Sequence, residues 1–360
     1  MIQAEKETGM RAVITGTGMY VPPTIVKNDD LIRIMDTSDQ WIRQRTGIEE
    51  RRFVEAGVAT SDLAAAAGKA AIADAGLEPS DIDLVVNATM TPDYYFPGPA
   101  PLIQHKLGLG NIPCLDLRQQ CMGFVYALNT ADAFVRSGQS RHVLVIGAEV
   151  HSCMMPWKSW DVLLGRSNDP VPPDEYENNT LTRGRTVLFG DGAGAVVVSA
   201  VDTEDTGVID SLIHTDGSQV ERLWTKGGGS AFRPFFTSEM IETGDITPFV
   251  DGRRVYALAV THMPQVTIEL LESHGLVPDD LDLVIMHQAN LRINEGVQKR
   301  LGLPDDKVFN NIHNYGNTTA GTIPIAFHEA LEQGRAKPGD LVCFVGLGSG
   351  LNWGAILYRC

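Results

Sequence analysis

Short apolar runs alternate along the chain with longer segments in which apolar positions recur at helical spacing. The segment TSDLAAAAGKAAIADAG (60–76) predicts a helix with Thr60 or Ser61 as its N-cap and Gly76 as its C-terminal stop. Buried strands are predicted for four apolar runs: RAVITGTGMYV (11–21), DLVVNATM (83–90), HVLVIGAE (142–149) and GAGAVVVSA (192–200). This alternation predicts an α/β body whose strands are covered on both faces.

One stretch of this pattern occurs twice. GLEPSDIDLVV begins at Gly76, and GLVPDDLDLVI begins 199 residues later at Gly275; the two share Gly, Leu, Pro, two Asp, Leu and Val at matching positions. The offset is far longer than that of a solenoid repeat. It therefore predicts two similar halves, an N-terminal half over residues 1–204 and a C-terminal half over residues 205–360.

The same offset relates two loops that carry polar side chains. It aligns the loop that contains Cys121 with NYGNTTAG (314–321), which contains Asn317, and a helix-like segment follows each loop. In the C-terminal half, the repeated strand leads directly into His287. If the halves pack face to face, Cys121, His287 and Asn317 converge on one central cleft.

Two stretches interrupt the alternation. Residues 152–180, rich in Pro, Asp and Asn, form an insertion that we interpret as a long loop, and long loops are often functional or mobile. The glycine-rich segment KGGGSAFRPF (226–235) predicts a second, flexible loop.

Composition and charge narrow the class of protein. The 360 residues are 43% hydrophobic and 21% charged, which is typical of a globular protein with a sizeable core. The net charge of −16 argues against nucleic acid as the main partner. We expect neither a membrane span nor a signal peptide, and hence a cytoplasmic protein. The five cysteines contain no CxxC pair, so neither a metal site nor a disulfide framework is predicted.

Cys121 stands where a predicted strand ends and a predicted helix begins, in DLRQQCMGFVYALNTADAF (116–134). A thiol at a helix N-terminus faces the positive end of the helix dipole and free backbone N–H groups, and both favour the thiolate. Gly123 leaves room for close approach of backbone or substrate. Cys121 is therefore a candidate nucleophile; a small buried packing residue is the alternative.

His287 and Asn317 are candidates for different reasons. His287 follows a predicted strand in VIMHQAN (284–290), and open α/β sheets place ligands at the carboxyl ends of their strands. A hydrogen-bonded structural histidine is the alternative. Asn317 by itself is typical of a turn or helix cap.

Two glycine clusters lie beside predicted strands. FGDGAGAVVVSA (189–200) contains G-x-G-x-x-A at Gly190, Gly192 and Ala195, but a dinucleotide fingerprint requires a following helix, and a strand is predicted here. We therefore predict no nicotinamide site. GLGSGLNWG (346–354) offers backbone N–H groups to an oxyanion.

Together these motifs resemble a known family. They are TSDQWIRQRTGIEERR (37–52), RQQCMGF (118–124), FGDGAGA (189–195), HQANLRI (287–293), NYGNTTAG (314–321) and GLGSGLNWGA (346–355). Their order and spacing are similar to those of β-ketoacyl-[acyl carrier protein] synthase III, one of the thiolase-fold condensing enzymes, over nearly the whole chain. The resemblance implies a duplicated five-layer α/β/α/β/α body that forms a homodimer, in agreement with the internal repeat.

The resemblance also implies roles for the candidate residues. Cys121 is the acylated nucleophile, and His287 and Asn317 polarise the thioester carbonyl of a malonyl unit. The backbone N–H groups of Cys121 and Ser349 form the oxyanion hole. No cofactor or metal is implied, because coenzyme A thioesters enter as substrates.

Further residues are implied to bind substrates and the partner protein. They are Trp41 and Arg183, which sandwich the adenine of coenzyme A; Arg45, a nearby coenzyme A contact; Phe96, which lines or closes the acyl pocket across the dimer; and Arg292, Lys299 and Arg300, a basic patch for acidic acyl carrier protein. For this patch a solvated helix face is the alternative.

The implied reaction suits these residue types. The Cys121 thiolate attacks an acyl thioester and forms an acyl-enzyme. Each oxyanion donor is worth roughly 3 kcal/mol in such a step. A malonyl thioester then loses CO₂, and His287 and Asn317 stabilise the resulting enolate as neutral hydrogen-bond donors. The carbanion attacks the acyl-cysteine, and a β-ketoacyl product leaves.

Four features depart from the family pattern. Gln119 and Gln120 precede the nucleophile where small residues are usual, Ser349 interrupts a run of three glycines, Arg253 stands where an asparagine is expected, and the insertion at 152–180 is long. They predict a variant acyl donor, such as that of a synthase in specialised metabolism.

Two other functions stay open at this point. An acyltransferase would use the same three side chains to pass the acyl group to an oxygen or nitrogen nucleophile without loss of CO₂. A non-catalytic α/β module would keep the coenzyme A site and perform no chemistry.

Overall fold

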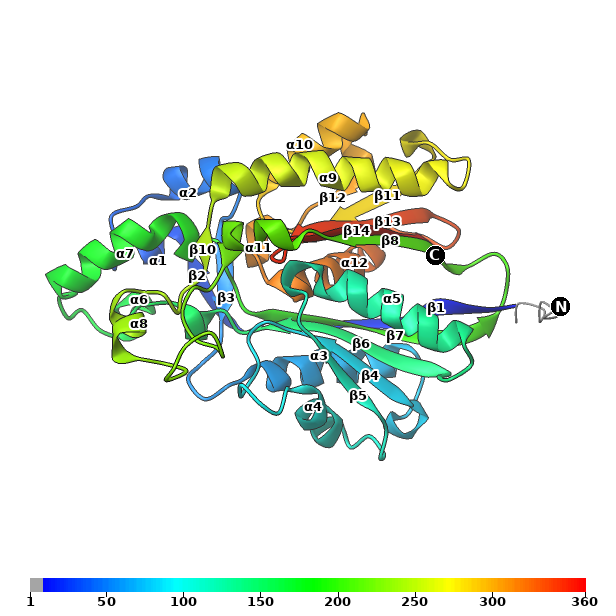
Figure 1. The fold of residues 1–360 in the computed structure, drawn as a ribbon, viewed down its shortest axis with the longest axis horizontal. Helices are drawn as coiled ribbons and strands as arrows, with labels where there is room; N and C mark the ends of the chain where they lie inside the picture. The colour runs from blue at the N-terminus through cyan, green and yellow to red at the C-terminus, as the bar shows by residue number, and fades with distance from the viewer. Residues whose placement is uncertain (1–8) are drawn as a thin grey trace.

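Two five-stranded sheets organise residues 9–360, the part of the chain that the computed structural model describes (Figure 1). The strands of the first sheet are, in spatial order, β1 (Met10–Tyr20), β7 (Gly192–Asp202), β6 (His142–Glu149), β4 (Leu84–Ala88) and β5 (Cys114–Leu117). Those of the second, in reverse order, are β8 (Gly207–Thr215), β14 (Asn352–Arg359), β13 (Leu341–Gly348), β11 (Leu283–Met286) and β12 (Val308–Phe309). The two orders match strand for strand, and the first sheet is complete before the second begins.

The strands also pair in the same directions in both sheets. β4 runs parallel to β5 and β6, and β11 runs parallel to β12 and β13. The next two strands are antiparallel in each sheet. The duplication predicted from the repeated stretch is therefore present in topology as well as in sequence.

Helices separate and cover the two sheets in five layers, as predicted (Figure 1). The central layer contains α5 (Gly123–Arg136) and α12 (Thr322–Glu332), whose first residues are again 199 positions apart. The outer layers are formed on one side by α3 (Thr60–Asp74) and α4 (Ala100–Leu107), and on the other by α9 (Gly252–Glu272) and α10 (Leu291–Leu301). The largest apolar cluster lies in the middle, where α5 and α12 contact both sheets.

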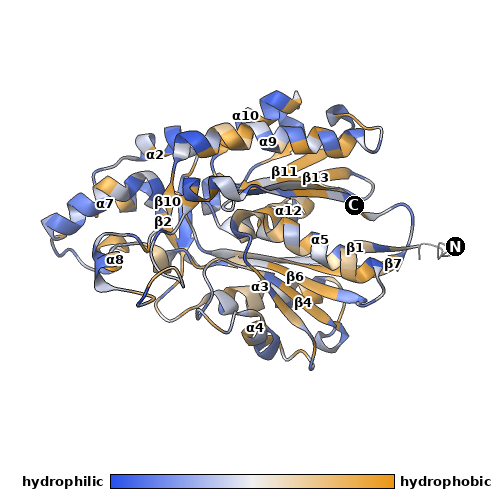
Figure 2. Ribbon diagram, in the orientation of Figure 1, coloured by the Kyte–Doolittle hydropathy of each residue, from blue (hydrophilic) through white to orange (hydrophobic). Residues whose placement is uncertain are grey.

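Burial on both faces explains the unbroken apolar character of the central strands. Every residue of β4 and of β11 is buried, so neither strand shows the alternation of a half-exposed sheet. Figure 2 shows these strands as largely hydrophobic, whereas α2 (Asp39–Thr46) and α7 (Pro173–Thr186) are mostly hydrophilic.

A smaller unit covers one end of the two sheets. Its apolar cluster includes Ile42, Phe53, Trp157 and Leu163. Its elements are β2 (Thr24–Lys27), β3 (Glu50–Phe53), α1 (Asn28–Leu31), α2, α6 (Trp160–Leu163) and α7. Four further short elements are α8 (Ser238–Glu242), β9 (Leu223–Trp224), β10 (Phe249–Val250) and α11 (Ile312–Tyr315).

The prediction that residues 152–180 form only a long loop is wrong. They contain α6 and the first half of α7, and Trp157 and Trp160 pack against Phe53 with ring centroids 6.0 and 5.6 Å apart. Proline in the first turn, acidic residues after it and arginines in the last turn of α7 are helix signals that its polar composition obscured.

The start of α3 differs by one residue from the prediction. The helix begins at Thr60, but Ala59 occupies the N-cap position, and neither Thr60 nor Ser61 does. The Asp62 carboxylate accepts a hydrogen bond from the Ala59 N–H, so a side chain of the first turn satisfies the backbone N–H of the N-cap residue. Gly76 follows the helix with a φ of 67°, as expected of a helix stop.

Candidate active site

A cavity of about 1670 Å³ opens at the carboxyl ends of the central strands. Residues of both halves line it, among them Cys121, His287, Asn317 and Ser349. The structure therefore brings together the side chains that the internal repeat related to one cleft. They lie on different elements, far apart in the sequence, and only the stacking of the two sheets makes them neighbours.

Cys121 lies in a short 3₁₀ turn, Gln120–Met122, between β5 and α5. The residue before it, Gln120, has a φ of 46°, and its mate in the C-terminal half, Thr319, has a φ of 47°. These are the only non-glycine residues with positive φ among residues 9–360. Both halves thus use the same unusual turn directly before a central helix.

The thiol of Cys121 is buried, and its electrostatics differ from those expected of a helix start. Burial raises the pKa of Cys121 to about 12, and the nearby Glu149 carboxylate acts in the same direction. Hydrogen bonds from the backbone N–H groups of Cys121 and Ser349 lower the pKa but do not outweigh these effects. The expectation that this position favours the thiolate is therefore wrong for the free thiol.

Close packing explains two glycines around Cys121. A Cβ atom added to Gly348 would lie 2.8 Å from the Cys121 Cβ. Only glycine therefore allows the end of β13 to pack this closely against Cys121. A Cβ atom at Gly123 would lie 2.7 Å from the Ala88 Cβ and 3.0 Å from the Ala320 Cβ. Gly123 therefore serves the packing of the two halves, where we predicted room for backbone or substrate.

His287 presents one ring nitrogen to the cavity. Its Nδ1 lies 2.7 Å from the Thr322 Oγ1, and its Nε2 is buried without a hydrogen-bond partner within residues 9–360. Burial lowers the pKa of His287 to about 3, so the imidazole is neutral at physiological pH. When Thr322 donates its hydroxyl hydrogen to Nδ1, the ring proton is on Nε2, where it can be donated to a substrate oxygen.

Asn317 is held by both halves of the protein. Its backbone N–H donates to the Leu188 carbonyl at 2.8 Å, and its carbonyl accepts from the Gly190 N–H at 3.1 Å. Its side-chain Oδ1 accepts from the Thr319 N–H at 2.8 Å. With the carbonyl oxygen engaged, the side-chain NH₂ group is left to donate.

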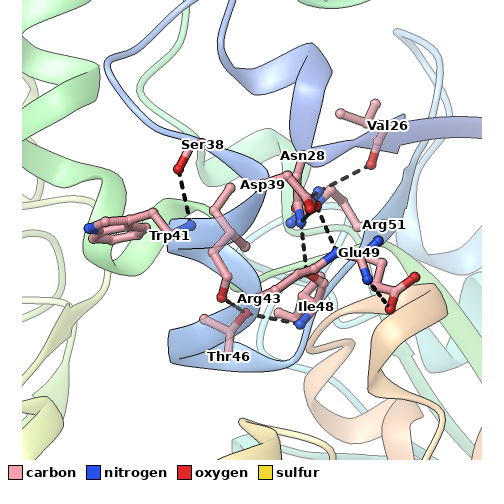
Figure 3. A network of polar contacts seen from close by, with 11 residues as sticks. Val26, Asn28, Ser38, Asp39, Trp41, Arg43, Thr46, Ile48, Glu49 and Arg51 are labelled. Carbon is pink, nitrogen blue, oxygen red and sulfur yellow. Dashed lines mark hydrogen bonds and ion pairs between the residues drawn. The ribbon is translucent and has the colours of Figure 1, made fainter.

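An indole platform lies at the cavity wall on α2. Trp41 and Arg45 both line the cavity, and the Arg45 guanidinium lies 4.4 Å from the centroid of the Trp41 ring. The helix is capped by Ser38, which accepts from the Trp41 N–H at 3.1 Å (Figure 3). The buried Arg51 donates to the Asn28 side-chain oxygen at 2.8 Å, and the Asn28 amide donates to Asp39 in the first turn of α2 at 2.9 Å. A polar network thus fixes the direction of the platform.

Arg183 also lies over the Trp41 indole. Its guanidinium lies 4.9 Å from the Trp41 ring centroid and 3.3 Å from the Asp36 carboxylate. A purine stacked between Arg183 and Trp41 would need about 7 Å between them, because each stacked contact takes about 3.5 Å. The structure brings the two residues together, but an adenine sandwich requires Arg183 to move outward.

The remaining predicted residues lie at or outside the cavity mouth. Phe96 is 82% exposed and does not line the cavity of its own chain. Arg292 lines the cavity at the start of α10, and Lys299 and Arg300 are exposed at its end. Arg253, on the adjacent α9, also lines the cavity.

Three buried residues beside the site were missed by sequence reasoning. Glu149 accepts hydrogen bonds from Thr89, Met90 and Thr91 and influences the Cys121 thiol. Burial lowers the pKa of His151 to about 3, and the nearby His287 acts in the same direction. Both follow β6 or end it, so the rule that drew attention to His287 applies to them too. Thr319 was recognisable only as the repeat mate of Gln120.

Replacing Glu149 by glutamine is expected to make Cys121 more reactive, in a pH-dependent way. Burial raises the pKa of Glu149 to about 7, so its charge is present at pH 8.5 and largely absent at pH 6. At pH 8.5 the variant should react with iodoacetamide roughly threefold faster at Cys121, equivalent to about half a pKa unit, and at pH 6 equally fast. Peptide mass mapping separates Cys121 from the exposed Cys153.

The stability of the same variant provides a second readout. Folded Glu149 holds its proton more tightly than unfolded glutamate, so the free energy of unfolding contains a contribution that is lost as pH rises from about 4.5 through 7. Glu149→Gln should flatten this dependence in denaturant titrations. Equal alkylation ratios at both pH values would contradict the assigned influence of Glu149.

Comparison with known proteins agrees with the geometry. The family described as 3-Oxoacyl-[acyl-carrier-protein (ACP)] synthase III matches residues 115–166 and 175–217, and its C-terminal counterpart matches residues 271–360. The β-ketoacyl-[acyl-carrier-protein] synthase III of Caldanaerobacter subterraneus subsp. tengcongensis is 43% identical over 348 residues, 97% of each chain.

Solved structures show the same similarity. The 3-oxoacyl-[acyl-carrier-protein] synthase III of Aquifex aeolicus VF5 has a TM-score of 0.82 and 38% identity, with 97% of this chain and 100% of that chain covered. The priming β-ketosynthase from the R1128 polyketide biosynthetic pathway has a TM-score of 0.83 and 31% identity, with 97% of both chains covered.

Two stacked, duplicated halves with a cysteine, a histidine and an asparagine around one cavity define a thiolase-fold condensing enzyme. The chain belongs to the β-ketoacyl-[acyl carrier protein] synthase III family. Within residues 9–360 no helix is long and apolar enough to cross a membrane, and no group of three or more His, Cys, Asp or Glu side chains could hold a metal ion.

Proposed function

We propose that this protein transfers an acyl group from coenzyme A to Cys121 and then condenses it with a malonyl thioester, with loss of CO₂, in fatty acid biosynthesis or a related pathway. One observation carries the proposal. A buried cysteine of one half shares its cavity with a neutral histidine and an oriented asparagine of the other.

The first half-reaction uses the nucleophile and two backbone donors. The Cys121 sulfur attacks the thioester carbonyl, a carbon–sulfur bond to Cys121 forms, the bond to coenzyme A breaks, and the thiol proton leaves with coenzyme A. The N–H groups of Cys121 and Ser349 converge beside the sulfur and are available to the oxyanion. Because the free thiol has a raised pKa, bound substrate must promote its deprotonation.

The second half-reaction uses the side chains of the C-terminal half. Loss of CO₂ from the malonyl thioester places negative charge on the thioester oxygen as an enolate. The Nε2 of His287 and the amide of Asn317 stabilise this charge as neutral donors in a water-poor site, where hydrogen bonds to an anion are strong. The enolate carbon then attacks the acyl group on Cys121 and releases the sulfur.

Substrate entry is supported by the platform and the cations at the cavity wall. Trp41 and Arg45 offer a stacking surface for the adenine of coenzyme A, with Arg183 closing over it after an outward movement. Phe96, together with the exposed Tyr94 and Tyr95, supports a homodimer in which this loop reaches a second copy.

We further propose that α10 binds acyl carrier protein. On a chain with a net charge of −16, Arg292, Lys299 and Arg300 form a local cationic surface, and none of them forms an ion pair within residues 9–360. Arg253 on the neighbouring α9 extends this surface to the cavity. An acidic partner is attracted locally to a protein that would otherwise repel it.

Charge reversal on α10 tests this surface. Lys299→Glu combined with Arg300→Glu is expected to raise KM for malonyl-acyl carrier protein roughly tenfold, since two attractive contacts become repulsive. KM for malonyl-CoA should stay within about twofold, because both residues lie away from the cavity wall. Steady-state kinetics with the two donors make the comparison. Equal effects on both donors, or none, would refute carrier-protein docking at α10.

The reaction itself is tested with a panel of acyl-CoA primers. Intact mass spectrometry should show one acyl adduct, located on Cys121, and addition of malonyl thioester should release CO₂ and give the β-ketoacyl product. Acyl transfer to an alcohol or amine without CO₂ would identify an acyltransferase instead. Binding of coenzyme A with no adduct from any primer would identify a non-catalytic module.

A further inference from the structure

His151 is a buried histidine that the reaction above does not use. It is 0% exposed, and its ring stacks on Phe189 with centroids 4.4 Å apart. Its Nε2 lies 2.5 Å from the Thr319 Oγ1, while its Nδ1 has no hydrogen-bond partner within residues 9–360. An apolar side chain of similar size would avoid burying an unpaired nitrogen. What an apolar residue could not supply here is the hydrogen bond to Thr319.

Thr319 occupies a conformation that its side chain disfavours. Its φ of 47° is rare for a β-branched residue, and such residues persist only where surrounding contacts hold them. The side chain is buried, and His151 is its one side-chain hydrogen-bond partner in the described chain. The contact with His151 is therefore one of the restraints on this turn.

The backbone of Thr319 reaches both proposed enolate donors. Its N–H donates to the Asn317 Oδ1 at 2.8 Å, which leaves the Asn317 NH₂ group as the free end of the amide. Its carbonyl oxygen lies 2.9 Å from the Thr322 Oγ1, which in turn lies 2.7 Å from the His287 Nδ1. The Thr319 carbonyl accepts a hydrogen bond from the Thr322 hydroxyl, so it holds Thr322 in contact with the His287 ring.

We propose that His151 is a positioning residue for malonyl decarboxylation. By holding the Thr319 hydroxyl, it fixes the two peptide groups that orient Asn317 and hold Thr322 against the His287 ring. The inference rests on the proposed function, because it concerns the decarboxylation step of that reaction. It concerns that step alone, since the N–H groups that serve Cys121 acylation belong to Cys121 and Ser349 and lie outside these contacts.

Two substitutions break the contact from opposite sides. His151→Leu removes the ring, and Thr319→Val removes only the hydroxyl from a side chain of nearly the same shape. Each is expected to slow CO₂ release from malonyl thioester roughly tenfold or more, because small misplacements of oriented groups cost that much. Acylation of Cys121 by acyl-CoA should change by less than about threefold.

Conservative variants and a double variant separate positioning from general damage. His151→Gln and Thr319→Ser keep a hydrogen-bonding group and should recover most of the decarboxylation rate. The double variant His151→Leu with Thr319→Val should be no slower than the slower single variant, since both remove one contact. His142→Leu is a matched control, because His142 bonds Ser199 at the other end of β6; it should leave both half-reactions unchanged.

Three results would overturn the inference. They are unchanged CO₂ release in folded Thr319→Val, equal slowing of both half-reactions in His151→Leu and Thr319→Val, and additive effects in the double variant. In each case the unmodified protein still releases CO₂ and the proposed function stands. Failure of the unmodified protein to decarboxylate any malonyl thioester would remove the proposed function and this inference together.

Discussion

Replacing Cys121 by serine is expected to abolish the acyl-enzyme and to lower the condensation rate on the order of 10⁴-fold or more, as loss of a nucleophile does in other covalent enzymes. The serine hydroxyl is a far weaker nucleophile than a thiolate, and within residues 9–360 only backbone N–H groups, and no base, form hydrogen bonds with the side chain at position 121. Intact mass spectrometry after mixing with acyl-CoA measures the adduct, and product formation measures the rate.

The same variant should still decarboxylate malonyl thioester, because His287 and Asn317 and their partners are untouched. CO₂ release without condensation is thus the signature expected of Cys121→Ser. Cys153→Ser, which alters an exposed cysteine, is the matched control and should keep the adduct. An adduct of full yield on Cys121→Ser would place the nucleophile elsewhere.

Replacing His287 or Asn317 by alanine is expected to slow decarboxylation and to leave acylation of Cys121 largely intact, the reverse of the result expected for Cys121→Ser. Each removes one donor to the enolate oxygen, and the loss of one such donor costs about 10²–10³-fold in rate. CO₂ release and condensation should fall by this factor, while acylation of Cys121 falls far less. Rapid-quench acylation and CO₂ release, measured on the same preparations, give the ratio of the two half-reactions.

The pH dependence of decarboxylation offers a check on the neutral state of His287. Burial lowers the pKa of His287 to about 3, so no loss of activity from its protonation is expected between pH 5 and 8. The same shift affects stability. Because the pKa is about 6.5 in the unfolded chain and about 3 in the folded protein, the free energy of unfolding falls as pH decreases from about 6.5 to 3.

Equal loss of both half-reactions in His287→Ala and Asn317→Ala would contradict the assignment of these two residues to the enolate.

The site works through burial as much as through charge. Burial keeps His287 neutral and raises the pKa of both the Cys121 thiol and the Glu149 carboxyl. The same exclusion of water strengthens each hydrogen bond to a developing oxyanion or enolate.

Local sequence signals accounted for much of the fold. Apolar runs marked the central strands β4, β6 and β7, and glycine marked the end of α3. They failed at α7, whose polar surface hides a regular helix, and at its neighbour α6, where Trp160 and the preceding Trp157 pack within the smaller unit. α6 is stabilised by contact with the distant Phe53, and α7 by Asn179, which donates to the Ile34 carbonyl; no short window of sequence contains these contacts.

By itself, the sequence determined the duplicated architecture and the identity of the three candidate side chains, because a repeat and a set of motifs are properties of residue order. Only the tertiary structure decided their environment. Packing within the smaller unit placed Arg183 over Trp41, and stacking the two sheets buried Cys121 and reversed the expected direction of its pKa shift. It also joined His151 to Thr319 across 168 positions of sequence. Burial and long-range hydrogen bonds depend on which segments meet in space, and a linear pattern does not contain that information.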